Sequence, residues 1–264
     1  LSAEFFKNKN IPLIHTEHYS GMNQNVLSNY YMTLGSNTYH NMDKVIAVSG
    51  SLAKNIEDKF GIKPVVIPNI VDTSVFRYVA SKKSGDTFNI ISVGNLLENK
   101  RMDLLITSFG EVFRDIKKVK LYIYGEGPEK NKLKAIIDKS GLVNKVFLMG
   151  LVDRNTIAEK MQECQCFVLT SRSETFGVAY IEAMTAGLPV IATKCGGPED
   201  FVNTSNGILI EVDNKEELTR ALKYMYNNNN KYNKEMISKE AINQYSSNNI
   251  IKLLINEYEN VLKG

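Results

Sequence analysis

Short apolar runs alternate with amphipathic segments along most of the chain. Runs typical of buried strands occupy 11–14, 45–48 and 65–67, and helical periodicity marks 25–39 and 52–60. Beyond a polar stretch at 72–86, strands are predicted near 88–93, 120–124, 146–149, 167–169, 190–192 and 208–210. Helices are predicted near 101–115, 128–139, 153–163, 177–186, 215–227, 234–244 and 247–262. This alternation predicts an α/β fold with parallel sheets and a ligand site at the carboxyl ends of the strands.

The polar stretch separates two units of unequal size. Residues 1–72 contain three predicted strands, which are too few for a self-sufficient doubly wound domain. We therefore predict part of a first domain over 1–72, a linker over 73–86, a second domain over 87–245 and a terminal helix within 246–264. There is no initial Met, and Leu1 to Lys9 has the pattern of the end of an amphipathic helix, so we expect the chain to begin partway through a larger protein.

The stretch from Thr170 to Pro189 combines the end of a strand, a polar loop and a helix. At the helix start, backbone N–H groups have no partner within the helix, and the partial positive charge there suits a phosphate. Glu174 and Glu182 frame this helix end, and carboxylates accept hydrogen bonds from hydroxyl groups. One interpretation is a nucleotide-sugar that spans the helix start, with Glu182 on the ribose and Glu174 on the sugar. The other is a pair of exposed helix glutamates, and the residues alone favour neither.

Composition narrows the classes of function. The net charge of +3 comes from lysines spread along the chain, which does not indicate binding to nucleic acid. No apolar run approaches the roughly 18 residues of a membrane span, although a mildly basic protein is compatible with peripheral association at an anionic membrane. Cys164, Cys166 and Cys195 lack metal-ligand spacing and are predicted to be buried, reduced thiols of a cytoplasmic protein. The Asn-rich stretch 227–233 is predicted to be a surface loop.

The segment Glu174-x7-Glu182, followed by Ala-Met-x-x-Gly-Leu-Pro-Val-Ile, resembles the signature of the family 4 retaining glycosyltransferases of the GT-B type (glycosyl transferases group 1). Other blocks resemble the family in the same order: Val45–Ser49, Val66–Asn69 with Val71-Asp72 and Phe76, Ser92–Lys100, Tyr124–Pro128, Met149–Asp153 and Cys195–Glu199. The resemblance implies a GT-B fold with two Rossmann-like parallel-sheet domains, the first only partly present. It also implies that the last helix crosses back onto this first, acceptor-binding domain.

Lys100 is the predicted cation for the diphosphate. A bound diphosphate carries about −2, and a helix end supplies only about +0.5. The chain has no Asp-x-Asp motif for Mg²⁺, so we expect neither a metal nor another cofactor. The alternative for Lys100 is an ordinary exposed loop lysine. Many family members have Arg where Asn95 stands and Gly where Arg101 stands, so Arg101 is a candidate for the charge that Asn95 lacks.

The resemblance, together with the helix-start argument, assigns these donor-binding residues: Gly94, Asn95, Lys100, Gly125, Val152, Glu174, Phe176, Gly177, Val178 and Glu182. The predicted catalytic residues are His18, Glu174 and Lys100, where His18 aligns with a donor-facing histidine of the first domain. A tight turn at Gly125 and a structural histidine at His18 are the alternatives for those two positions.

The resulting hypothesis is a retaining, metal-independent hexosyltransferase. It would use a nucleotide-sugar, with UDP the favoured nucleotide, and a saccharide or lipid-linked acceptor in the synthesis of a surface polysaccharide. Its expected place is the cytoplasm, including the inner face of the membrane. Two other functions stay open: a donor-binding module completed by a partner or by missing N-terminal residues, and a GT-B nucleotide-sugar epimerase.

Overall fold

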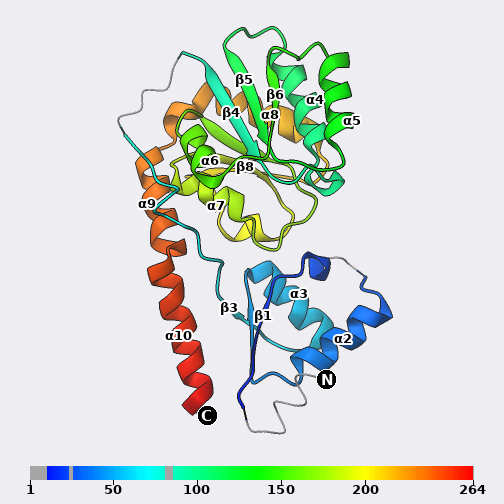
Figure 1. Ribbon diagram of the computed structural model, residues 1–264, viewed down its shortest axis with the longest axis vertical. Helices are drawn as coiled ribbons and strands as arrows, with labels where there is room; N and C mark the ends of the chain where they lie inside the picture. The colour runs from blue at the N-terminus through cyan, green and yellow to red at the C-terminus, as the bar shows by residue number, and fades with distance from the viewer. Residues whose placement is uncertain (1–10, 24–25, 81–85, 264) are drawn as a thin grey trace.

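The computed structural model describes residues 11–23, 26–80 and 86–263, so the pattern at Leu1–Lys9 lies outside the described residues. The described chain forms two parallel sheets, one above the other along the long axis of the molecule (Figure 1). This arrangement confirms the prediction of an α/β protein built on two parallel sheets.

Nine α-helices lie within the described residues: α2 (Asn29–Tyr39), α3 (Gly50–Phe60), α4 (Met102–Phe113), α5 (Lys130–Lys139), α6 (Arg154–Met161), α7 (Val178–Thr185), α8 (Lys215–Asn228), α9 (Lys234–Tyr245) and α10 (Ser247–Lys263). Four short 3-10 helices accompany them: η1 (Ser20–Asn23), η2 (Glu98–Lys100), η3 (Gly197–Asp200) and η4 (Asn229–Lys231). Several begin at a capping residue of the expected type; Ser49, for example, accepts a hydrogen bond from the backbone N–H of Leu52 at the start of α3.

The first sheet has the order β1-β2-β3, with β1 at Ile14–Glu17, β2 at Lys44–Ala47 and β3 at Val65–Val66. Successive side chains of a strand point to opposite faces of the sheet. In β2, Val45 and Ala47 join the large core that includes residues of α3, whereas Ile46 joins a separate cluster with Ile67 and Ile250. Ile250 belongs to α10, so the last helix covers the face of the first sheet opposite to α3.

The second sheet has the order β6-β5-β4-β7-β8-β9 with all neighbours parallel: β4 (Phe88–Val93), β5 (Val119–Tyr124), β6 (Val146–Gly150), β7 (Cys166–Leu169), β8 (Val190–Thr193) and β9 (Gly207–Ile210). The chain winds outward from β4 to β6, returns to the middle of the sheet at β7 and then winds outward in the other direction. In the packing of helices on this sheet, α4 contacts α5 and α8, and α7 contacts α9. The point of reversal lies between β4 and β7.

The chain passes between the two domains twice, once just before the linker and once between α9 and α10, and these two segments lie side by side. The backbone N–H of Val71 donates to the carbonyl oxygen of Tyr245 at 3.0 Å, and Val71 forms a parallel bridge with Ser246. Beyond this crossing, α10 descends along the first domain (Figure 1), where Lys44 pairs with Glu257 at 3.3 Å. The terminal helix thus attaches the end of the described chain to the first domain.

Three local predictions differ from the structure. The first helix begins at Asn29 rather than Asn25, because Ser28 accepts from the N–H of Tyr31 and caps it. The stretch 227–233 is not wholly a loop, since α8 runs to Asn228 and η4 follows. There Asn229 donates from its side-chain amide to the carbonyl oxygen of Gln165 at 2.9 Å, which attaches the segment to the core. The first strand occupies Ile14–Glu17 rather than 11–14, because these residues pair with Lys44–Ala47 of β2.

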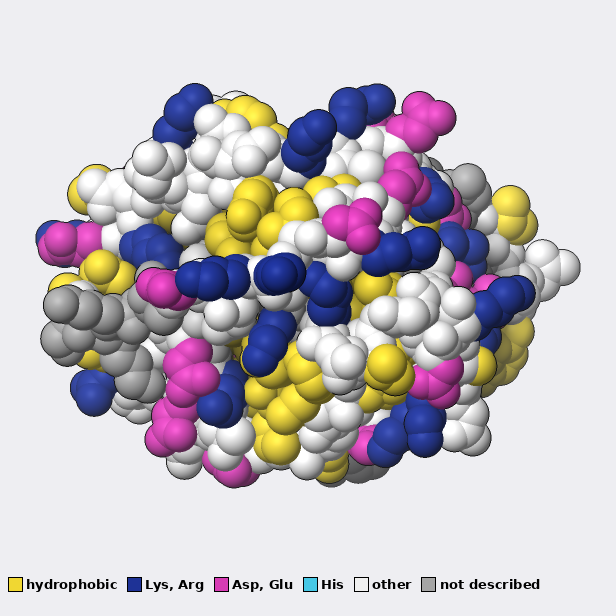
Figure 2. Space-filling model, turned by 90° about the horizontal axis from the view of Figure 1, so that it is seen from above, with side chains coloured by type: hydrophobic (Ala, Val, Ile, Leu, Met, Phe, Trp, Pro, Cys, Tyr) yellow, Lys and Arg dark blue, Asp and Glu magenta, His cyan; other side chains and the backbone are white. Residues whose placement is uncertain are grey.

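Among the described residues, no helix is both long enough and apolar enough to cross a bilayer. From above the second domain, a short row of Lys and Arg side chains crosses the centre of the surface, with acidic side chains near it and apolar patches on both sides (Figure 2). All three cysteines are buried, as predicted, and burial raises the pKa of the Cys164 and Cys195 thiols to about 12.

Glu17, at the end of β1, is a buried carboxylate held by four donors. Its oxygens accept from the hydroxyl of Tyr39 at 2.5 Å, the ring Nε2 of His15 at 3.2 Å and the N–H groups of His18 and Tyr19 at 2.9 and 2.7 Å. Burial by itself would raise the pKa of Glu17, but the bonds from His15, Tyr39 and Tyr19 outweigh it and lower the pKa to about 2. This ionised carboxylate holds the loop that carries His18.

We expect Glu17→Gln to destabilise the protein by about 1–3 kcal/mol at pH 7, because buried donors lose a charged acceptor. The folded pKa of Glu17 lies below its value in the unfolded chain, about 4.3. Its contribution is therefore complete above that value and is lost as the pH falls toward 2. Denaturant unfolding at pH 7 and pH 3 should show a smaller difference in the variant than in the wild type. Glu240→Gln, on the exposed face of α9, serves as the control.

Equal pH dependence of unfolding in the Glu17 variant and the wild type would show that Glu17 does not link stability to pH.

Candidate donor-binding site

The loops that follow β4 and β7 meet at the point where the strand order reverses. In open α/β sheets, the crevice at such a point is where ligands bind. The N–H of Arg172 donates to the carbonyl oxygen of Asn99 at 2.8 Å, and Thr170 donates from its hydroxyl to the carbonyl oxygens of Lys100 and Arg101 at 3.2 and 2.9 Å. These bonds hold the segment before α4 against the segment before α7, which are the two segments that carry Lys100 and Glu174.

A cavity of about 180 Å³ lies at the carboxyl ends of β4, β5 and β6. Five of the predicted donor-binding residues line it: Gly94, Asn95, Gly125, Val152 and Glu182. Its wall also includes Phe76, Leu151 and Arg154, which the sequence analysis did not assign to the site. These five predicted residues are spread over 88 positions of the chain, from Gly94 to Glu182, and the structure brings them together.

A glycine allows the chain to close around this cavity. Gly125 has φ of 140°, a conformation in which a side chain would be strained. A Cβ atom at Gly125 would lie 2.0 Å from the carbonyl oxygen of Gly94. The N–H of Gly125 donates to the carbonyl oxygen of Gly150, and the N–H of Gly94 donates to that of Tyr124, so the ends of the three strands are joined. The turn predicted at Gly125 is thus required by close packing of backbone against backbone.

Glu182 is a buried carboxylate on the wall of the cavity. Its Oε1 lies 2.7 Å from Nη2 of Arg154, whose guanidinium also lies over the ring of Phe76, 5.1 Å from the ring centroid. Burial raises the pKa of Glu182, and the charge of Arg154 partly offsets this. The alternative of two exposed helix glutamates is therefore wrong for Glu182, whose side chain is 9% exposed.

Lys100 and Glu174 form an ion pair beside the cavity. Nζ of Lys100 lies 2.6 Å from Oε1 of Glu174, which also accepts from the hydroxyl of Ser171 at 2.7 Å. Both side chains are largely buried, with 19% and 12% of their surfaces exposed. The alternative that Lys100 is an ordinary exposed lysine is therefore wrong, and a cation and a carboxylate stand together at the mouth of the crevice.

The start of α7 has the geometry expected for a close approach to the backbone. Gly177 caps the helix with φ of 92°, and a Cβ atom there would lie 2.7 Å from the ring of Tyr180. Val178 is the first residue of α7, so its N–H group has no acceptor within the helix. The side chain of Phe176 is buried against Phe201 and Tyr245, so this residue can meet a ligand only through its backbone.

Arg101 does not face the cavity. Its backbone has φ of 49°, a left-handed conformation that explains a preference for Gly at this position. Its guanidinium pairs with Asp103 at 3.1 Å and with Asp213, so its charge is already engaged by carboxylates of its own domain. The arginine that lines the cavity is instead Arg154 at the start of α6. Its place at the carboxyl end of a predicted strand was the signal that could have found it.

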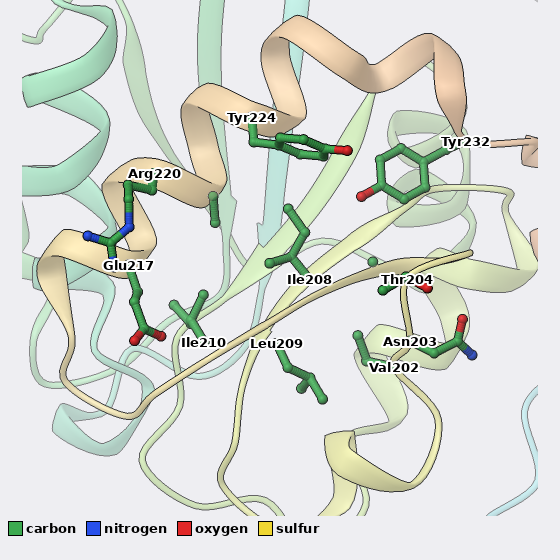
Figure 3. A pocket seen from close by; sticks show the side chains of 12 residues that line it. Val202, Asn203, Thr204, Ile208, Leu209, Ile210, Glu217, Arg220, Tyr224 and Tyr232 are labelled. Atoms are coloured by element: carbon green, nitrogen blue, oxygen red, sulfur yellow. The ribbon is translucent and has the colours of Figure 1, made fainter.

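His18 is exposed on the loop that follows β1 in the first domain and is not among the residues that line the cavity. Of the described residues, no group of three His, Cys, Asp or Glu side chains is arranged to hold a metal ion. A larger cavity of about 630 Å³ lies elsewhere, between β9 and α8 (Figure 3). Tyr224 and Tyr232 border it, and the described residues that line it include none of the predicted site residues.

Comparison with known proteins relates this site to a family. The model of the glycosyl transferases group 1 family matches residues 78–243, and that of Glycosyltransferase Family 4 matches residues 2–75. The chain is 31% identical over 214 residues to an N-acetylgalactosaminyltransferase of Campylobacter jejuni that acts on a diphospho-undecaprenol-linked saccharide, covering 78% of this chain and 56% of that protein. It is 29% identical over 222 residues to the GtfA subunit of a UDP-N-acetylglucosamine–peptide N-acetylglucosaminyltransferase of Streptococcus agalactiae, covering 79% and 43%.

Solved structures show the same architecture. TarM of Staphylococcus aureus, crystallised as a mutant in complex with Fondaparinux, alpha-GlcNAc-glycerol and UDP, is 26% identical with a TM-score of 0.80, over 94% of this chain and 51% of that one. HepE of Anabaena, in complex with UDP and glucose, is 21% identical with a TM-score of 0.86, over 98% and 74%. These likenesses confirm the GT-B fold.

The chain spans about half the length of the curated relatives it matches, from 36% to 56%. The family model nevertheless covers all of the second domain's strands, including both glutamates of the signature. The chain therefore belongs to the glycosyl transferases group 1 family.

Proposed function

We propose that this protein transfers a sugar from a nucleotide-sugar to a saccharide or lipid-linked acceptor, with retention of anomeric configuration and without a metal ion. The observation that carries this proposal is the arrangement at the reversal of strand order. A cavity with a buried carboxylate, Glu182, shares this crevice with an ion pair, Lys100–Glu174, and the start of α7. These three features provide for a ribose, a sugar and a diphosphate in one crevice.

Each part of the donor has a group suited to it. Glu182 accepts hydrogen bonds from the ribose hydroxyls, and the backbone near Val152 and Gly125 encloses the base. Lys100 and the N–H groups at the start of α7 stabilise the negative charge that develops on the diphosphate as the glycosidic bond breaks. Glu174 holds hydroxyls of the sugar, and His18 orients the donor from the first domain. Most of the catalysis then comes from positioning and from stabilisation of the leaving group.

The relatives indicate the class of donor and acceptor. The named activities transfer N-acetylhexosamines, one of them to a diphospho-undecaprenol-linked saccharide, and TarM and HepE were crystallised with UDP. A UDP-sugar as donor and a lipid-linked or polymeric saccharide as acceptor fit this pattern. Action at the cytoplasmic face of a membrane, as a peripheral protein, would place the enzyme beside such an acceptor.

Calorimetric titration with UDP, GDP and ADP in EDTA tests the donor site. We expect saturable binding of one nucleotide, UDP, since TarM and HepE were both crystallised with UDP. Absence of binding by all three nucleotides would contradict the proposal that this crevice is a nucleotide site.

Glu182→Ala should weaken nucleotide binding by about 1.5–3 kcal/mol, roughly 10- to 150-fold in Kd, because the ribose loses hydrogen bonds to a charged acceptor. Glu235→Ala is the matched control, since Glu235 pairs with Lys239 on the exposed side of α9. Titration of both variants with UDP gives the comparison. An unchanged Kd in the Glu182 variant would rule out its contact with the ribose.

Activity should not depend on a divalent metal, because Lys100 and the start of α7 supply the positive charge. Initial rates of transfer, measured with and without EDTA, are expected to agree within about twofold. Activity that EDTA abolishes and Mg²⁺ restores would disprove metal independence.

A further inference from the structure

Asn23, the last residue of η1, reaches from the first domain to the sugar end of the donor site. Its side-chain amide Nδ2 donates to the carbonyl oxygen of Glu174 at 2.9 Å and to the hydroxyl of Ser173 at 3.3 Å. These bonds join residues about 150 positions apart, across the boundary between the two sheets. Asn23 thus contacts the backbone of the residue whose carboxylate pairs with Lys100.

The amide of Asn23 is held in this orientation from its own domain. Its Oδ1 accepts from the side-chain amide of Asn55 on α3 at 3.1 Å, so both donor positions of its nitrogen are directed at the second domain. Gly196 leaves the space that this contact needs, because a Cβ atom there would lie 2.9 Å from Nδ2 of Asn23 and 2.5 Å from the carbonyl oxygen of Glu174. The second domain therefore leaves a space into which the Asn23 side chain of the first domain fits.

Glu174 is consequently held at both ends. Its carboxylate accepts from Lys100 and Ser171, and its carbonyl oxygen accepts from Asn23 and from the N–H of Gly197 at 2.9 Å. A shift of its backbone would move the carboxylate and its partner Lys100 together. The contact with Asn23 exists only when the two domains are close.

A second contact between the domains lies nearby. Asp200, in η3, accepts from the N–H of Gly50 at the start of α3, at 2.6 Å. The partial positive charge at that helix start favours a carboxylate there. A side chain at Gly50 would crowd this contact, since its Cβ atom would lie 3.1 Å from Oδ1 of Asp200. Through the hydrogen bonds of Asp200 and Asn23, α3 and η1 of the first domain are attached to the loops that surround Glu174.

The nucleotide end of the crevice does not share this dependence. The described residues that line the cavity at Glu182 come from the second domain and, in Phe76, from the linker. Separation of the two domains would therefore leave the cavity for the base and ribose in place, but would release Glu174 from Asn23.

We propose that Asn23 is a positioning residue, which places Glu174 for the sugar of the donor when the domains close. This inference rests on the proposed function, because it assigns Glu174 to the sugar. It makes sugar recognition, but not nucleotide recognition, depend on domain closure. Asn23 itself acts through Glu174 and takes no part in bond breaking.

The first test measures the domain contact without any ligand. Spin labels at Lys54→Cys on α3 and Lys139→Cys on α5 report the distance between the domains, and the three natural thiols are buried. Asn23→Ala should lengthen or broaden the distance distribution. Asn41→Ala, whose side-chain amide donates to the carbonyl oxygen of Asn37 in the same domain, should leave it unchanged.

The second test compares UDP with UDP-N-acetylglucosamine by titration. In Asn23→Ala, the gain in affinity that the sugar provides should fall about 5- to 10-fold, as expected for the loss of one or two neutral hydrogen bonds. The Kd for UDP alone should stay within about twofold. Asn55→Ala should show a smaller loss in the same direction, and Asn41→Ala none.

An unchanged sugar-dependent gain, or an equal loss for UDP and UDP-N-acetylglucosamine, overturns the proposal, since the second result would show a general structural role. Failure of the wild type to bind either compound refutes the proposed function instead. In that case the distance measurement still decides whether Asn23 ties the two domains together.

Discussion

The structure depends on one topological constraint: β4 and β7 lie side by side although β5 and β6 come between them in the chain. Their loops leave the same edge of the sheet and must part toward opposite sides, which opens a crevice between them. Thr170 and Arg172 hold the walls of this crevice together, and Gly125 lets neighbouring strand ends approach closely. Lys100, Glu174 and the start of α7 are placed by these loops, so their arrangement follows from the order of the strands.

Each end of the crevice pairs a buried carboxylate with a single cation. Glu182 pairs with Arg154, and Glu174 pairs with Lys100. A buried charge without a partner is costly, so these pairs preserve two acceptors in a largely buried site. Because the ligand that we propose is rich in hydroxyl groups and carries a diphosphate, both signs of charge are useful. Hydroxyls can bond to the carboxylates, while the phosphates attract the lysine. The pairs therefore stabilise the free protein with the same groups that would bind a donor.

The two domains contribute differently to this site. The end of the crevice at Glu182, which we assign to the base and ribose, is built within the second domain and closed by Phe76 from the linker. The end at Glu174, which we assign to the sugar, is reached by Asn23 from the first domain, and the hydrogen bond between Asp200 and Gly50 lies close to it. The chain also crosses between the domains at Val71 and Tyr245, which are hydrogen-bonded to one another. The two passages of the chain between the domains are thus joined at one short paired segment.

The sequence by itself determined the alternation of strands and helices, because burial in a parallel sheet demands short apolar runs and leaves a periodic pattern. It also indicated the start of α7 and both glutamates, because their residue types and spacing can be recognised within one short stretch of sequence. What it could not determine were the partners of those groups. No local pattern names the partners of Arg154 and Asn23, which reach Glu182 and Glu174 only after the sheet has formed. Arg101 shows the converse, since its charge, visible in the sequence, is engaged by Asp103 and Asp213 away from the cavity. Local pattern sets secondary structure, whereas contacts between distant segments are decided by tertiary packing.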